Sequence, residues 1–252
     1  MVKSCNFDFE YSIIFDADNT LYEVEPKKAY KVQNSYICNL LNISIDLFEK
    51  QYQQAIEKIK KEKSLIKRNR TYSISKTINL ILKKKQIKLD NKIIKNISKK
   101  ALDLFYIELL ESGIKYNENT ILLMEKLRQK YNLFIASDEF EEPLKKKLNL
   151  VFGDYKKYFK FVLSCQIAGE LKPSEKYYKI ILNKFNLKKN KCIIIGDDWF
   201  RDLKSAKDNG IITVLVNNKK TGEPTYWIKN LDELNDLYNY PVFTINYIKI
   251  NQ

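Results

Sequence analysis

The chain contains no histidine among its 252 residues. Histidine supplies the base of Ser-His-Asp triads, the commonest ligand of catalytic zinc and the side chain that most often exchanges protons near neutral pH. All three kinds of site are therefore excluded here. Any chemistry must depend on carboxylates, lysines and hydroxyl groups.

Cysteine is also scarce, and the four cysteines, at positions 5, 38, 165 and 192, form no Cys-x-x-Cys pair. This spacing indicates neither a zinc knuckle nor a disulfide framework, so we expect reduced thiols. The sequence has no apolar run near the ~20 residues that a membrane span needs, and no cationic start followed by a long apolar run. We therefore expect a cytoplasmic protein without a membrane partner.

Hydrophobic residues make up 44% of the chain, which is enough for a folded core, and the formal net charge is +14. The lysines are spread along the whole sequence. Two interpretations remain open: a compositional bias of the proteome, or a surface that attracts anionic ligands or nucleic acid. We do not expect nucleic acid to be a partner.

An apolar run at residues 11–15 stops abruptly at Asp16, and Asp18 follows two residues later. A short run of this kind predicts a buried central strand, and open α/β sheets build their sites at the carboxyl ends of such strands. Two adjacent carboxyl groups can serve as a nucleophile and as a proton carrier. A loop with two solvated acids is the simpler alternative.

The remaining pattern predicts an α/β protein with a Rossmann-like, doubly wound parallel sheet and an inserted all-helical domain. Residues 22–116 show helical periodicity, whereas helices and strands alternate from residue 119 onward. We assign residues 1–21 and 117–252 to the core and 22–116 to the insert. Expected helices are 26–41, 44–67, 73–85, 91–111, 120–131, 143–150, 174–185, 202–209 and 231–238, and expected strands are 132–136, 159–164, 191–195, 211–216 and 226–228. Residues 241–252 form either an added strand or an interface.

Three of the apolar strands end in hydroxyl or carboxylate residues. Parallel strands would bring these side chains to one edge of the sheet. A magnesium ion suits such a cluster, because it prefers oxygen ligands and is usually held by one or two carboxylates. Lys172 could balance the negative charge. The cluster would consist of Asp16, Asp18, Ser137, Asp197 and Asp202.

These motifs, in this order, resemble those of the haloacid dehalogenase superfamily in its phosphatase branch. The first motif of that family matches at Asp16, Asp18 and Thr20, and the second matches at Ser137. The third, a lysine usually followed by proline, matches at Lys172. The fourth, Gly-Asp followed by a second Asp, matches at 196–197 and Asp202, and the resemblance covers residues 11–237.

The resemblance implies a role for each matched residue. Asp16 would be the nucleophile that becomes aspartyl-phosphate, and Asp18 would be the general acid and base. Asp16, Asp197 and the backbone carbonyl of Asp18 would hold Mg²⁺. Ser137, the backbone N–H of Asp138 and Lys172 would bind the phosphoryl group. Asp202 would order the surroundings of the metal, and Thr20 would fix the turn.

The insert resembles the small helical cap that selects the substrate in this family. Arg68, Arg70 and Tyr72 could meet a phosphate or stack on a base, although a solvated basic loop is an alternative. Trp199 could stack on a ligand or serve packing. Asn19 tolerates the left-handed turn that glycine would otherwise supply.

We therefore expect a magnesium-dependent phosphomonoester hydrolase, a monomer or homodimer, acting on a small phosphorylated metabolite. The form of the first motif resembles that of 5′-nucleotidase relatives, so nucleoside 5′-monophosphates are candidate substrates. The alternatives are a sugar-phosphate mutase or other phosphotransferase of the same fold, and a binding protein with a basic surface that attracts nucleic acid.

Overall fold

The computed structural model of the chain describes residues 9–60 and 69–234. These residues divide into two compact units. Of the described residues, 9–24 and 115–234 form the core unit, and 25–60 and 69–114 form the helical unit.

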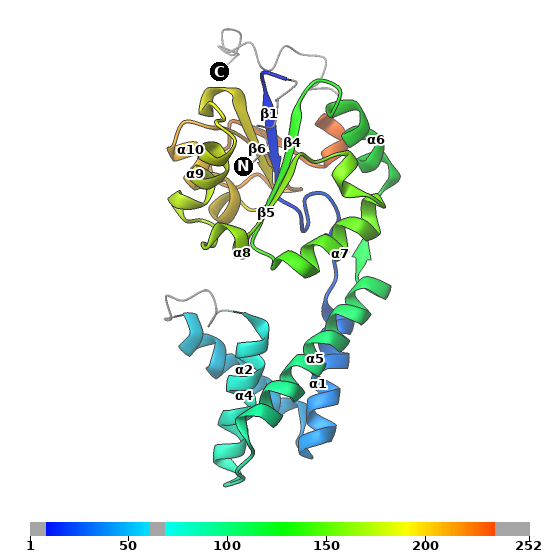
Figure 1. Cartoon of the computed structure of the whole chain (residues 1–252), viewed down its shortest axis with the longest axis vertical. Helices are drawn as coiled ribbons and strands as arrows, with labels where there is room; N and C mark the ends of the chain where they lie inside the picture. The colour runs from blue at the N-terminus through cyan, green and yellow to red at the C-terminus, as the bar shows by residue number, and fades with distance from the viewer. Residues whose placement is uncertain (1–8, 61–68, 235–252) are drawn as a thin grey trace, which may run out of the picture. The chain divides into compact units, whose positions relative to one another are not determined.

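Within residues 9–24 and 115–234, the core unit is built on one sheet of six parallel strands in the order β5-β4-β1-β6-β7-β8 (Figure 1). The two strands beside β1 are β4 and β6, and all three are buried along their length. Buried parallel strands of this kind confirm the predicted α/β fold. The strands are β1 (Ser12–Phe15), β4 (Asn132–Ser137), β5 (Phe161–Ser164), β6 (Cys192–Gly196), β7 (Ile212–Val216) and β8 (Tyr226–Ile228).

The register of the central strands decides where the polar residues lie. Phe15, the last residue of β1, pairs with Ile135 of β4 and Ile195 of β6. Asp16 follows Phe15 directly, while Ser137 and Asp197 come two residues after their paired positions. The three side chains therefore begin at nearly the same level of the sheet, at its carboxyl edge.

Helices cover both faces of the sheet. In Figure 1, α9 and α10 lie on one side of the strands, and α6 and α7 lie on the other. This arrangement is the one that alternating helices and parallel strands predict. The helices are α6 (Glu118–Leu127), α7 (Glu141–Phe152), α8 (Cys165–Ala168), α9 (Glu175–Lys184) and α10 (Lys204–Asp208), with 3₁₀ turns at Tyr155–Lys157, Lys189–Lys191 and Leu231–Glu233.

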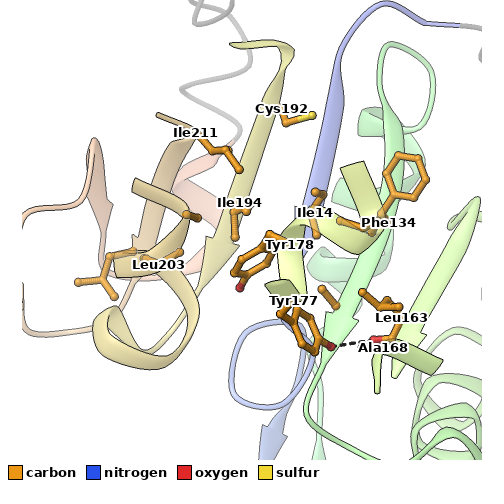
Figure 2. Close-up of a cluster of buried hydrophobic side chains, with 14 of the residues drawn as sticks. Ile14, Phe134, Leu163, Ala168, Tyr177, Tyr178, Cys192, Ile194, Leu203 and Ile211 are labelled. Atoms are coloured by element: carbon orange, nitrogen blue, oxygen red, sulfur yellow. Dashed lines mark hydrogen bonds between the residues drawn. The ribbon is translucent and has the colours of Figure 1, made fainter. Parts of the chain in front are cut away.

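Two neighbouring tyrosines of α9 connect the core to the carboxyl ends of the strands (Figure 2). Tyr177 is fully buried, and its hydroxyl donates to the backbone oxygens of Ser137 at 2.7 Å and Leu163 at 3.1 Å. The Tyr178 hydroxyl donates to the backbone oxygen of Asp202 at 2.6 Å. Helix α9 thereby fixes the ends of β4 and β5 and the turn after β6.

In residues 25–60 and 69–114, the described part of the helical unit, four helices pack around an apolar core that includes Ile37, Phe48, Ile74, Ile78 and Ala101. Each helix presents one apolar stripe inward, as its periodicity predicts. The helices are α1 (Lys27–Leu41), α2 (Ile45–Lys60), α4 (Arg70–Lys84) and α5 (Asn91–Ser112).

Two short strands lie where the chain passes between the units, and the sequence pattern does not predict them. β2 (Glu23–Val24) and β3 (Ile114–Lys115) form a two-stranded ribbon, which the Glu25 N–H extends by donating to the Gly113 oxygen at 2.8 Å. Strands of two residues carry no periodicity, so only the pairing in space creates them.

The structure also differs from the sequence prediction after β6. The helix expected at 202–209 is preceded by a π-helical turn, Trp199–Leu203, because the Asp198 side chain accepts hydrogen bonds from the Phe200 and Arg201 N–H groups and starts the turn early. The helix expected at 231–238 begins as a 3₁₀ turn. Its remainder, the tail at 241–252 and the end of the helix expected at 44–67 lie outside the described residues.

Candidate active site

Asp16 and Lys172 meet at the carboxyl edge of the sheet. The Lys172 side chain is completely buried, and its ammonium group contacts Asp16 Oδ1, Asp202 Oδ1 at 2.6 Å and the Ala136 oxygen at 3.2 Å. Burial acts to lower the pKa of Lys172, but the charges of Asp16 and Asp202 hold it well above its ordinary value. Lys172 is therefore a permanent cation between two carboxylates.

Asp202 comes close to β6 because Gly196 has no side chain. A Cβ at Gly196 would lie 2.6 Å from the Asp202 Cβ, which is closer than packing allows. Both oxygens of the Asp202 carboxylate are already engaged, one by Lys172 and the other by the Asp198 N–H at 3.1 Å. Asp202 is thus suited to holding Lys172 and the turn in place.

Asp16, Asp197 and Asp202 each offer a carboxylate oxygen, and these oxygens lie within 4.8 Å of one another. Three carboxylates and the one ammonium group of Lys172 leave a formal charge of −2, which a divalent cation would neutralise. The Asn217 side-chain amide donates to the backbone oxygen of Asp197 at 3.0 Å and not to its carboxylate. The oxygen-only donor set therefore fits a hard divalent cation.

The pKa values of two of these carboxyl groups are raised, chiefly by burial and further by neighbouring negative charge. Burial raises the pKa of Asp16 to about 7, with Asp202 adding to the shift and Lys172 opposing it. Burial also raises the pKa of Asp197 to about 6, and the Asp202 charge contributes. Both groups would be stabilised in their ionised form by a bound cation.

The turn after β1 places the second carboxylate. Asn19 adopts φ 60°, as expected for a left-handed turn, and its side chain accepts a hydrogen bond from the Val24 N–H at 3.0 Å. The Thr20 hydroxyl donates to Asp16 Oδ2 at 3.3 Å. Asp18 is half-buried, and both oxygens of its carboxylate contact the Lys147 ammonium group, at 2.7 and 2.6 Å.

Ser137 is the last residue of β4, and Asp138 follows it directly. The buried Ser137 hydroxyl accepts a hydrogen bond from the Glu139 N–H at 3.1 Å. The Asp138 carboxylate accepts from the Lys172 N–H at 2.8 Å and from the Arg201 guanidinium at 3.2 Å. Asp138 therefore joins the loops that carry Ser137, Lys172 and Asp202, which is more than sequence reasoning assigned to its side chain.

The three residues expected to contact the substrate belong by sequence to the helical unit: Arg68, Arg70 and Tyr72. The Arg70 guanidinium lies 3.5 Å from the centre of the Phe105 ring and donates to the Gln33 side-chain oxygen at 3.5 Å. Tyr72 is half-buried beside Lys76, and Arg68 lies outside the described residues.

Trp199 serves packing. It is buried in the core cluster, and a Cβ at Gly222, which has φ +64°, would lie 2.2 Å from its indole nitrogen. The loop that carries Gly222 therefore lies directly against the ring, and no ligand could stack on that part of it.

Sequence reasoning missed Lys147, Glu139 and Arg201. A signal for Lys147 exists: Leu144, Leu148 and Val151 form the buried stripe of α7, and Lys147 falls on the same stripe, directly after two further lysines. A lysine on the apolar face of a helix usually has a buried counter-ion.

A polar groove of about 520 Å³ borders the carboxylate cluster at Asp197. Loops after β1, β6 and β7 form its walls together with the start of α6, and its lining includes Asn19, Asn117, Asn217 and Lys229. The groove provides space for a polar ligand beside the carboxylate cluster of the core unit.

The chain matches the model of one protein family over most of its length. The model of the haloacid dehalogenase-like hydrolases matches residues 12–210. Among curated proteins, bifunctional epoxide hydrolase 2 of Mus musculus is 37% identical over 62 residues, and that of Rattus norvegicus is 38% identical over 60 residues. These matches cover 24% and 23% of this chain but only 11% and 10% of the relatives.

Solved structures share the fold over nearly the whole chain. They include the HAD-hydrolase YfnB from Bacillus subtilis bound to magnesium (19% identity, TM-score 0.64, covering 92% of this chain and 100% of that one). A 2-haloacid dehalogenase from Pseudomonas syringae pv. Tomato DC3000 gives 15% identity and a TM-score of 0.72 (90% and 97% covered). A HAD phosphatase from Thermococcus onnurineus gives 21% and 0.61 (91% and 98% covered).

The family model spans most of the chain, and it includes every motif residue brought together at the edge of the sheet. No described helix is long and apolar enough to cross a membrane. The protein belongs to the haloacid dehalogenase-like hydrolases.

Proposed function

We propose that the protein is a magnesium-dependent phosphomonoester hydrolase that works through an aspartyl-phosphate on Asp16. The observation that carries this proposal is the pair of carboxylates after β1, with Asp16 buried against Lys172 and Asp18 half-buried. One acid is protected and fixed, as a nucleophile requires, while the other remains accessible for proton transfer.

In the first step an oxygen of Asp16 attacks phosphorus, and the bond from phosphorus to the leaving oxygen breaks. The leaving oxygen takes a proton from the Asp18 carboxyl group. In the second step the Asp18 carboxylate removes a proton from water, the water oxygen attacks phosphorus, and the bond to Asp16 breaks. Inorganic phosphate leaves and Asp16 returns as a carboxylate.

The remaining residues of the site would hold the phosphoryl group. Ser137 and the backbone N–H of Asp138 would donate hydrogen bonds to its oxygens, and Lys172 would neutralise charge, held by Asp202. Asp16, Asp197 and the Asp18 carbonyl would hold magnesium, with Thr20 fixing the turn. Bound there, the ion would neutralise part of the negative charge on the phosphoryl oxygens.

The choice of phosphatase over dehalogenase rests on Asp18. Both kinds of enzyme occur among the structural neighbours. Dehalogenation needs a nucleophile but no acid for the leaving group, because a halide leaves unprotonated. A carboxyl group two residues after the nucleophile supports cleavage of a phosphate ester, whose leaving oxygen needs a proton.

The helical unit would act as the cap that selects the substrate, with Arg68, Arg70 and Tyr72 as candidate contacts. We propose a small phosphorylated metabolite in the cytoplasm, with nucleoside 5′-monophosphates as the first class to test. A basic side chain and an aromatic ring close together in sequence support recognition of a phosphate and a base.

The test is phosphate release from nucleoside monophosphates, sugar phosphates and phosphoglycolate, with Mg²⁺ or with a chelator, for the wild type and Asp16→Asn. We expect phosphate release from one substrate class, and we expect this release to require Mg²⁺. Asp16→Asn should abolish it, because the variant keeps the side-chain volume but removes the nucleophile. Circular dichroism controls for the fold of the variant.

Two results would overturn the proposal. Substantial turnover by Asp16→Asn would exclude the covalent mechanism, and full turnover in chelator would exclude the metal. Transfer of phosphate to an added hydroxyl compound in preference to water would identify a phosphotransferase.

A further inference from the structure

Lys147 is a buried cation that the proposed reaction does not use. Its side chain is 1% exposed, on the face of α7 that carries Leu144, Leu148 and Val151. Burying an ammonium group is costly unless counter-ions accompany it. The side chains around the Lys147 ammonium group must therefore supply negative charge.

Two carboxylates provide the compensation. The Lys147 ammonium group lies 2.7 and 2.6 Å from the two oxygens of Asp18, and 3.1 Å from Glu139 Oε2. Burial acts to lower the pKa of Lys147, but these two charges raise it above its ordinary value. Lys147 thus stays protonated and donates to both acids.

The three side chains differ in their exposure. The Asp18 side chain is 33% exposed and that of Glu139 is 18% exposed, whereas Lys147 is closed off from solvent. Lys147 therefore holds the Asp18 carboxylate from the buried side, while about a third of the Asp18 side chain stays accessible to solvent. Glu139 follows Ser137 by two residues, so the same contact joins the β1 and β4 loops.

We propose that Lys147 is a positioning residue for proton transfer by Asp18. This inference rests on the proposed function. Contact with both Asp18 oxygens fixes the direction of the carboxyl group, and Glu139 remains a counter-ion whenever Asp18 carries a proton. Lys147 keeps its own protons throughout: the proton that reaches the leaving oxygen comes from Asp18 and is later replaced from water.

The experiment compares substrates that differ in their need for an acid. Phenyl phosphate has a poor leaving group, which needs a proton. The 2,4-dinitrophenolate released from 2,4-dinitrophenyl phosphate leaves without protonation. For Lys147→Met we expect kcat/KM on phenyl phosphate to fall by about 100-fold, because this constant reports the steps up to departure of the leaving group and positioned acids contribute about 10²- to 10⁴-fold. On dinitrophenyl phosphate we expect kcat/KM to fall by about threefold or less, because that leaving group needs no acid.

Two further variants test whether Lys147 acts through Asp18. Asp18→Asn should show the same dependence on the leaving group, and the double variant Lys147→Met with Asp18→Asn should be no worse than Asp18→Asn alone. Lys147→Arg keeps the charge and should recover part of the loss. Lys146→Met is the matched control, because Lys146 is the exposed neighbour in α7.

Equal losses on both substrates, or losses that multiply in the double variant, would overturn the inference while leaving the proposed function intact. An inactive wild type on every phosphate would overturn the proposed function itself. If Lys147→Met does not fold, Glu139→Gln is the substitute, because it leaves Lys147 in place. It should show a smaller loss of activity that is again greater on phenyl phosphate than on dinitrophenyl phosphate. A loss in Glu139→Gln that is independent of the leaving group would refute the inference.

Discussion

Lys172 is the residue on which the charge balance of the site depends. It is the cation shared by Asp16 and Asp202, whose side chains are only 8% and 3% exposed to solvent. Even with Lys172 in place, the pKa of Asp16 is raised to about 7 and that of Asp197 to about 6. Without a metal ion, the folded protein therefore holds protons that the unfolded chain releases.

This raised affinity for protons sets a pH dependence. Between about pH 4 and about pH 7 the folded state binds more protons than the unfolded chain, so the stability of metal-free protein falls as pH rises. Mg²⁺ competes with the same protons. We expect Mg²⁺ to raise Tm more at about pH 8 than at about pH 5, as measured by thermal unfolding.

Asp197→Asn is the control for this prediction, because it removes a carboxylate of the cluster without changing the volume. The variant should lose most of the Mg²⁺-dependent rise in Tm at the higher pH. An equal rise at both pH values in the wild type would contradict the assigned cation site.

At the scale of elements, α9 does more than cover the sheet. The Tyr177 hydroxyl binds two backbone oxygens at the ends of β4 and β5, and Tyr178 binds the Asp202 oxygen. These bonds fix the loops of Ser137 and Asp202 from beneath. A buried hydroxyl with two acceptors contributes through the oxygens that its loss would leave unpaired.

We expect Tyr177→Phe to lower the free energy of unfolding by about 1–3 kcal/mol, because buried carbonyls would lose their donor. Urea unfolding monitored by circular dichroism measures the change. Tyr116→Phe is the matched control, because Tyr116 is 46% exposed, and it should change stability by less than about 0.5 kcal/mol. Equal effects of the two variants would show that the Tyr177 hydrogen bonds contribute nothing.

The elements also show how far sequence reasoning reaches. The central strands β1, β4 and β6 begin and end within one residue of prediction, because apolar runs that stop at polar residues are unambiguous in a buried sheet. The ribbon of β2 and β3 and the turn at Trp199–Leu203 depend on pairing and on the Asp198 cap. Such features arise from contacts in space and leave no periodicity in the sequence.

The same distinction holds in the site. Asp16, Lys172 and Asp202 could be brought together because each follows or adjoins a predicted strand end or motif. Lys147 was missed because it stands in a run of three lysines, 145–147, and lysines on a helix are normally solvated. Only the sheet, once formed, places α7 so that Lys147 reaches Asp18.

At the scale of the whole molecule, the helical unit is inserted between β1 and β4. Pairing of β2 with β3 keeps the points where the chain leaves and re-enters the core unit side by side. We expect a chain in which a short Gly-Ser linker joins Val24 to Lys115 to fold cooperatively, because no core strand of the six is lost.

Thermal unfolding and circular dichroism measure this outcome. The shortened chain should keep the Mg²⁺-dependent rise in Tm, since the carboxylate cluster is intact, and should lose it again with Asp197→Asn. An insoluble chain, or one without a cooperative transition, would show that the core unit needs the helical unit to fold.

The position of the insertion also bears on how the chain folds as it is synthesised. Ser12 of β1 pairs with Asn132 and with Cys192, so the central strand is made first but acquires its neighbours much later. The intervening helices make mostly local contacts and fold fast, which shortens the loop that the late pairing must close. Until β4 and β6 have been synthesised, the apolar β1 has no strand to pair with. This strand is therefore the segment most exposed to aggregation and to binding by chaperones.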